Sequence, residues 1–82
     1  MLNKEEKIKE IILEIIDENN LNKIDALVIK NDSLLTDDLG LDSLNLAQLT
    51  VKIEAELGID IFEKKIIRTF GEIMETLDWF FG

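Results

Sequence analysis

Isoleucines recur at helical spacing near the start of the chain, in a segment otherwise rich in charged residues. Five of them take positions i, i+3, i+4, i+7 and i+8 within residues 4–19: Ile8, Ile11, Ile12, Ile15 and Ile16. This spacing places them on one face and predicts an amphipathic helix of about four turns. Asn19 and Asn20 predict its end, because asparagine tolerates the left-handed conformation of a helix stop.

A second helical pattern covers residues 43–57, with Asp42 as a favourable N-cap and Gly58 as the stop. Its apolar residues form two stripes, one of Leu46, Leu49, Ile53 and Leu57 and one of Leu44, Ala47 and Val51. The first stripe is expected to face the core. The second either faces the core as well or forms an exposed apolar strip beside Asp38 and Glu54, which would be a protein-docking surface.

Residues 21–42 have no sustained period and predict a long connection with at most one short helical turn. Five apolar side chains are expected to hold this connection to the core: Leu27, Ile29, Leu34, Leu35 and Leu39. A structureless loop of this length is unusual in a compact domain and is often functional.

The C-terminal part predicts a short extended connector at residues 59–61 and at most one or two helical turns at 63–68. A last helix is expected from Glu72 to about Phe81, with Ile73, Leu77 and either Phe80 or Phe81 facing inward. The pattern as a whole predicts an all-α fold, a small four-helix bundle with three main helices, one short third helix and a long first loop. With 82 residues, the chain is expected to form a single domain, 1–82.

The chain is strongly acidic, with 18 acidic and nine basic residues and a net charge of −9. Such a surface repels nucleic acid and anionic membranes and favours partners with basic patches. Seven acids lie between residues 32 and 60, against the single base Lys52: Asp32, Asp37, Asp38, Asp42, Glu54, Glu56 and Asp60. An ordinary solvated surface with a chance cluster of acids is the alternative interpretation.

The location and assembly state are expected to be simple. No apolar run approaches the ~18 residues that a membrane span needs, and the N-terminus lacks the apolar core of a secretory signal. We therefore expect a cytoplasmic location. We also expect the chain to be a monomer.

Ser43 is the residue with the most informative chemical setting. The chain has no histidine, so Ser43 cannot be the nucleophile of a Ser–His hydrolase, and it has no cysteine, which excludes disulfides and thiolate zinc sites. The acidic loop lacks the ligand spacing of an EF-hand, so no metal site is expected. A helix start offers unpaired N–H groups and the positive end of the helix dipole, which favour a phosphate. Ser43 is therefore expected to be modified rather than to attack.

The chain resembles the acyl carrier protein family, which includes aminoacyl and peptidyl carrier domains. The resemblance rests on Asp37-Asp38-Leu39-Gly40-Leu41-Asp42-Ser43-Leu44 and on Leu57-Gly58-Ile59-Asp60-Ile61. It implies that 4′-phosphopantetheine esterifies Ser43, supplied from coenzyme A by a phosphopantetheinyl transferase that uses magnesium. It also implies that Asp42 and Leu44 belong to this attachment site. Gly40 is expected to allow a positive φ or a close backbone approach.

The resemblance further implies a non-catalytic carrier, which tethers acyl intermediates as thioesters and presents them to fatty-acid or polyketide-type enzymes with basic docking patches. Six residues are expected to contact such partners: Asp38, Leu44, Ala47, Gln48, Val51 and Glu54. Two alternatives stay open, an aminoacyl or peptidyl carrier of a specialised pathway and a helical adaptor that never carries an arm.

Some positions depart from the family pattern. Asn45, Gln48 and Ala55 stand where carriers of fatty-acid synthesis commonly have acids, and Phe62 replaces a frequent proline. The region of the third helix is basic, with Lys64, Lys65 and Arg68, where those carriers are acidic. These departures leave attachment at Ser43 intact, but they leave open whether the partners are housekeeping enzymes or those of a dedicated pathway.

Overall fold

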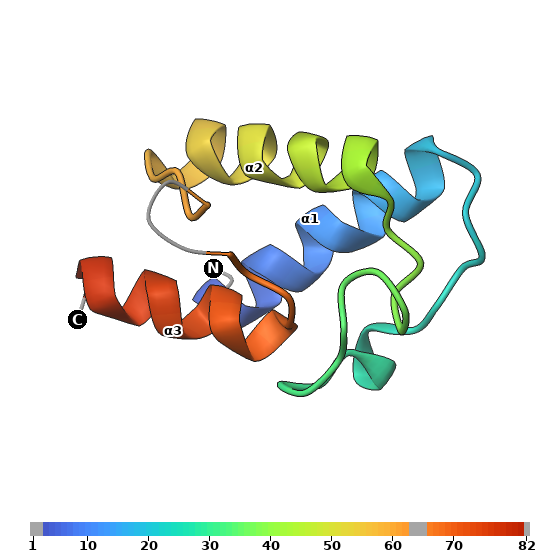
Figure 1. The fold of residues 1–82 in the computed structure, drawn as a ribbon, viewed down its shortest axis with the longest axis horizontal. Coiled ribbons are helices and arrows are strands. Elements are labelled where there is room, and N and C mark those ends of the chain that lie inside the picture. The colour runs from blue at the N-terminus through green and yellow to red at the C-terminus, as the bar shows by residue number, and fades with distance from the viewer. Residues whose placement is uncertain (1–2, 63–65, 82) are drawn as a thin grey trace.

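The computed structural model describes residues 3–62 and 66–81, which form a helical fold (Figure 1). Its elements are α1 (Lys4–Glu18), the short 3₁₀ helix η1 (Ala26–Val28), α2 (Ser43–Leu57) and α3 (Phe70–Phe81). The described residues contain no strand, and their only extended pairing is an isolated bridge between Leu34 and Thr69. The predicted all-α class is confirmed.

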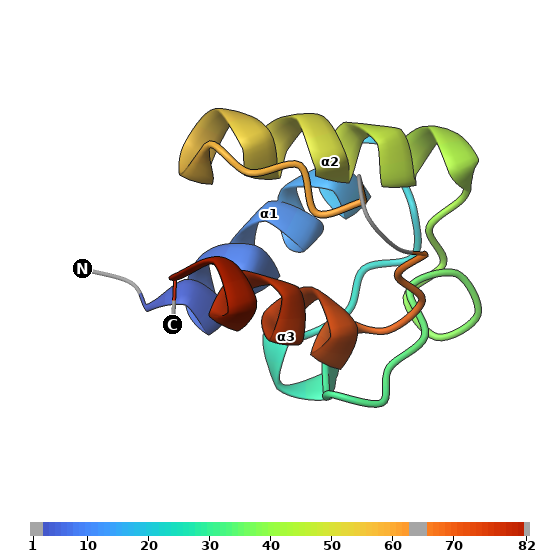
Figure 2. The same cartoon turned by 60° about the vertical axis from the view of Figure 1, so that its left-hand side comes forward.

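Helix α1 supplies the centre of the core. Its isoleucine face is buried as predicted, and α1 lies between α2 and α3 in both views of the ribbon (Figures 1 and 2). From α2, Leu49 and Ile53 are fully buried, while Leu46 and Leu57 pack against the core at its edge. The first apolar stripe of α2 therefore faces inward, as predicted.

Local capping explains where α1 begins and where α1 and α2 end. Asn3 accepts a hydrogen bond from the Glu6 N–H at 2.8 Å at the start of α1. After the C-terminus of α1, Asn20 adopts a φ of 54°, and Gly58 adopts a φ of 73° after α2. Both stops were predicted from asparagine and glycine, the residues that most readily enter this left-handed region.

Helix α3 begins two residues earlier than predicted, at Phe70 rather than Glu72. The Thr69 hydroxyl accepts from the Glu72 N–H at 3.1 Å, and the Glu72 carboxylate accepts from the Thr69 N–H at 3.1 Å. This is a capping box, which fixes the first turn despite Gly71. Ile73 and Leu77 are buried as predicted.

The inward position expected for Phe80 or Phe81 is not seen at Phe80, which is 40% exposed. The side chain of Phe81 lies outside the described part.

The long loop follows α1 and carries η1, the one short helical turn that the sequence allowed. Ile29, Leu35 and Leu39 are buried as predicted, but Leu27 and Leu34 are exposed, so the prediction was wrong for these two. No residue of η1 is buried, and Ile29, which follows η1 directly, is the side chain that enters the core there. Leu34 lies in extended backbone beside Leu35, so the two side chains point to opposite sides.

The chain between α2 and α3 differs from the expected short helix. Residues 66–68 are not helical, and positions 63–65 of that prediction lie outside the described residues. Ile59 and Ile61 are buried, and the Asp60 carboxylate accepts from the Phe62 N–H at 3.0 Å. The connector at 59–61 is thus held by two apolar anchors and one turn.

Ion pairs join α1 to α2 at the surface. Lys52 lies 3.1 Å from Glu18 and 3.6 Å from Glu14, and Lys7 lies 3.2 Å from Glu56. The hydrogen bond to Glu18, with the charges of both carboxylates, raises the pKa of Lys52 above its ordinary value of 10.5. None of the described helices has the length and apolar character that crossing a bilayer requires.

Candidate functional site

Ser43 is the first residue of α2, at the point where the long loop ends (Figure 1). Its side chain is exposed, whereas Leu41 just before it is buried and anchors this end of the loop. The hydroxyl is therefore accessible to another protein while the backbone on either side is held in place.

A reciprocal cap fixes the backbone around Ser43. The Asp42 carboxylate accepts from the Asn45 N–H at 2.8 Å, and the Asn45 side chain accepts from the Asp42 N–H at 3.0 Å. Asp42 is thus the N-cap that the sequence predicted. Asn45, which is 2% exposed, completes a capping box that the sequence analysis did not identify.

The start of α2 leaves two donors for an anion. The first N–H groups of a helix have no intrahelical acceptor, and Asp42 takes only that of Asn45. No acceptor within the described residues pairs with the N–H of Ser43 or Leu44. An exposed hydroxyl next to two such donors at a positive helix end fits the attachment of a phosphodiester.

The loop before Ser43 has a defined shape. Gly40 has a φ of 77°, which confirms the positive φ expected for it. The Asp38 carboxylate accepts from the Leu34 N–H at 2.7 Å, and Leu41 N–H donates to the Leu35 carbonyl at 3.0 Å. Leu35 N–H in turn donates to the Arg68 carbonyl at 2.8 Å, which ties the loop to the segment before α3.

The second apolar stripe of α2 is at the surface. Leu44 is 64% and Val51 is 65% exposed, and Ala47 between them is exposed too. Of the two interpretations left open by the sequence, burial of both stripes is wrong. Asp38 and Glu54 are also exposed. Leu44, Ala47 and Val51 are called the α2 strip below.

Gln48, expected to contact partners, is engaged within the molecule. Its side-chain oxygen accepts from the Asn19 side chain at 2.9 Å and from the Asn45 side chain at 3.3 Å. These three amides join the end of α1 to the first turns of α2. Asn19 was predicted only as a helix stop, and its contact with Gln48 had no signal in the sequence because the pair is distant along the chain.

The described residues offer no cluster of metal ligands. No group of three acidic side chains among them is placed to hold a metal ion, and the chain has neither histidine nor cysteine. The distinctive chemistry of this region is therefore the exposed Ser43 hydroxyl at a capped helix start.

Comparisons with known proteins address the same region. Residues 6–77 match the family model described as phosphopantetheine attachment site. An acyl carrier protein of Solidesulfovibrio magneticus is 37% identical over 59 residues, covering 72% of this chain and 68% of that protein. An acyl carrier protein of Rickettsia bellii is 31% identical over 61 residues, covering 74% of this chain and 69% of that protein.

Proposed function

The chain belongs to the acyl carrier protein family, and from this premise we propose that it tethers acyl intermediates as thioesters at Ser43 and presents them to fatty-acid or polyketide-type enzymes. Members of the family are carriers rather than catalysts, and their prosthetic group is covalently attached 4′-phosphopantetheine. The arm supplies a thiol, which the chain itself lacks.

The observation that carries the proposal is the setting of Ser43. Its hydroxyl is exposed at the first residue of α2, beside the unpaired N–H groups of Ser43 and Leu44. The capping box of Asp42 and Asn45 holds these donors in place. We propose that the donors face the phosphodiester after attachment and that Asp42 is also part of the surface that the transferase recognises.

The α2 strip supports a docking role in the same proposal. Its exposed side chains form an apolar centre, with exposed Glu54 three residues after Val51 on α2 and exposed Asp38 in the loop before α2. Protein interfaces commonly combine an apolar core with a polar rim, and complementary charge accelerates association. A phosphopantetheinyl transferase and acyl-handling enzymes with basic patches would fit this surface.

A dedicated pathway, including one with an aminoacyl cargo, is the second candidate. It is favoured by Asn45 and Gln48, neutral amides of α2 that bond to each other, with Gln48 also accepting from Asn19 at the end of α1. An enzyme that reads carboxylates on the first turns of α2 would find no charge at either position. Transfer assays with partner enzymes of each class distinguish the two candidates.

Intact mass tests attachment directly. The chain has two serines, Ser43 and Ser33, and the second is 7% exposed with its hydroxyl accepting from the Lys30 N–H at 2.8 Å. A phosphopantetheinyl transferase with coenzyme A should add one arm to the wild-type chain and to Ser33→Ala, and none to Ser43→Ala. If the wild-type chain accepts no arm, the helical adaptor becomes the better interpretation. An unchanged addition to Ser43→Ala would place the arm elsewhere.

A further inference from the structure

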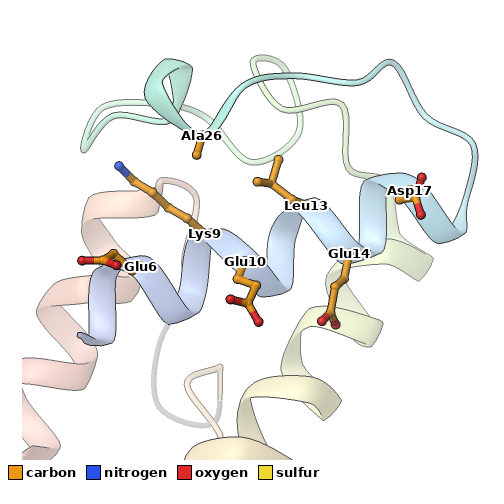
Figure 3. Close-up of a pocket in the computed structure, with 7 residues that line it drawn as sticks. All are labelled: Glu6, Lys9, Glu10, Leu13, Glu14, Asp17 and Ala26. Atoms are coloured by element: carbon orange, nitrogen blue, oxygen red, sulfur yellow. The ribbon is translucent and has the colours of Figure 1, made fainter. Parts of the chain in front are cut away.

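A groove runs along α1 beside the loop that carries η1 (Figure 3). This open groove has a volume of about 540 Å³ and is lined by α1 and by Ala26 of η1. Leu13 and Ala26 provide apolar surface, and four acids of α1 also line it: Glu6, Glu10, Glu14 and Asp17. The core isoleucines of α1 face the opposite direction, so this groove is separate from the α2 strip.

The four acids are arranged in a row along α1 rather than in a compact cluster. From Glu6 to Asp17 they extend over about 16 Å at the helical rise per residue. Within the described residues no three of them are close enough together to hold a metal ion. A row of acids of this length can pair with several separate positive charges, and it is less suited to a single metal cation.

Among the described residues, two of these four acids form ion pairs with lysines, and two do not. Asp17 lies 3.6 Å from Lys23, and Glu14 lies 3.6 Å from Lys52. Glu6 and Glu10 are in no ion pair within the described part of the chain.

The single base that lines the groove is already engaged. Lys9 lies 3.9 Å from Glu5 and 5.7 Å from the centre of the Phe70 ring. With four acids against this one lysine, the lining of the groove has a net negative charge.

The two residues that follow Ala26 on η1 are large, apolar and exposed. Leu27 is 82% and Val28 is 54% exposed, on the same short helix as Ala26. Backbone bonds hold them there, since Val28 N–H donates to the Asp25 carbonyl and Leu27 N–H to the Asp25 carboxylate. Large apolar side chains fixed at the surface beside an acid-lined groove are suited to contact with another protein.

We propose that this groove binds a basic amphipathic helix of a partner protein, with Lys or Arg side chains along Glu6 and Glu10 and apolar side chains against Leu13 and Leu27. The groove length matches about three helical turns. Nucleic acid and anionic membrane have the wrong charge for it. A second copy of this chain, with its own net charge of −9, is disfavoured for the same reason. The interaction goes beyond the proposed carrier function because it needs neither the arm nor the α2 strip.

Amide chemical shifts of the isotope-labelled full chain provide the test. The probe is a synthetic three-turn helical peptide with one face of leucines flanked by lysines, and the control peptide has serine in place of leucine. The leucine peptide should shift amides between Glu6 and Asp17 and from Ala26 to Val28, with the control peptide binding more weakly. Shifts spread over all acidic surfaces, or confined to the α2 strip, would overturn the proposal.

Matched variants separate the groove from general acidity. Joint replacement Glu6→Gln and Glu10→Gln should weaken binding about fivefold or more, as should Leu27→Ser, because each removes one component of the contact. Joint replacement Glu54→Gln and Glu75→Gln also removes two negative charges, away from the groove, and should leave binding unchanged. Equal weakening by this pair would show that only net charge matters. Repeating the titration with Ser43→Ala should give the same result, which separates this proposal from attachment of the arm.

Discussion

At the scale of single residues, one carboxylate serves both structure and the proposed chemistry. Asp42 caps α2, and it also precedes the serine in the motif shared with carrier proteins. The cap was predictable because it depends on residues close together in the sequence. The contribution of Asn45 was not identified because an asparagine three residues after the cap replaces the usual Glu or Gln of a capping box.

Two substitutions at Asp42 should separate these roles. Asp42→Ala should lower the free energy of unfolding by about 1 kcal/mol, because it removes the N-cap. In a domain of this size that lowers Tm by roughly 4–8 °C. Asp42→Asn should keep most of the stability, since asparagine caps as well as aspartate. Thermal melts measure both variants.

The same pair tests recognition of Asp42. If the transferase reads the charge, both variants should accept the arm more slowly than the wild-type chain, with intact mass followed over time as the readout. A loss of stability in Asp42→Asn equal to that in Asp42→Ala would instead indicate that the charge, not the hydrogen bond, stabilises the helix start.

At the scale of elements, periodicity predicted the helices and local signals predicted their ends. Helix α2 has the predicted bounds because an Asp cap and a Gly stop flank a clear pattern. The start of α3 was missed although Thr69 and Glu72 have the spacing of a capping box, because Gly71 in the first turn is a weak helix former. Leu27 and Leu34 were assigned wrongly because a loop without a period does not indicate which apolar side chain turns inward.

Periodicity also identified both stripes of α2 but not whether the second is covered, which depends on the number of helices packed around α2. The structure predicts that Val51→Asp changes the free energy of unfolding by no more than about 0.5 kcal/mol, because the side chain is exposed. The same substitution should slow transfer to a partner enzyme if the α2 strip is the docking surface.

The matched control lies two residues further along α2. Ile53 is fully buried, so Ile53→Asp places an unpaired carboxylate in the core and should cost several kcal/mol or unfold the domain. Thermal melts compare the two variants. A collapse of the melting transition in Val51→Asp would contradict the exposed position, and unchanged transfer would contradict the docking role.

At the scale of the whole molecule, charge is the dominant feature. Several acids of the 32–60 segment are held individually: Asp38, Asp42 and Asp60 accept backbone N–H groups, and Glu56 pairs with Lys7. These contacts do not change the net charge of the chain, which is −9. The longest extent of the molecule is 33 Å. At low ionic strength the Debye length is about 30 Å, so charges across the whole molecule interact.

Added salt should therefore stabilise the domain. Between about 10 mM and 150 mM monovalent salt the Debye length falls to about 8 Å, which screens the repulsion and should raise Tm. Joint replacement Glu54→Gln and Glu75→Gln removes two negative charges and should reduce the gain. A Tm that stays flat or falls over this range in the wild-type chain would show that the acids do not repel one another appreciably.

The bridge between the loop and the start of α3 has a consequence for local unfolding. Three neighbouring backbone bonds join the segments: Leu35 N–H to the Arg68 carbonyl, Phe70 N–H to the Ser33 carbonyl and Gly71 N–H to the Asn31 carbonyl. A Cβ at position 71 would lie 2.7 Å from the Asn31 carbonyl oxygen, so the two chains are in close contact there. Neighbouring bonds of this kind open together as one cooperative unit. We therefore expect the loop segment from Asn31 to Leu35 to open together with the start of α3, so that amide exchange in the two segments occurs at similar rates.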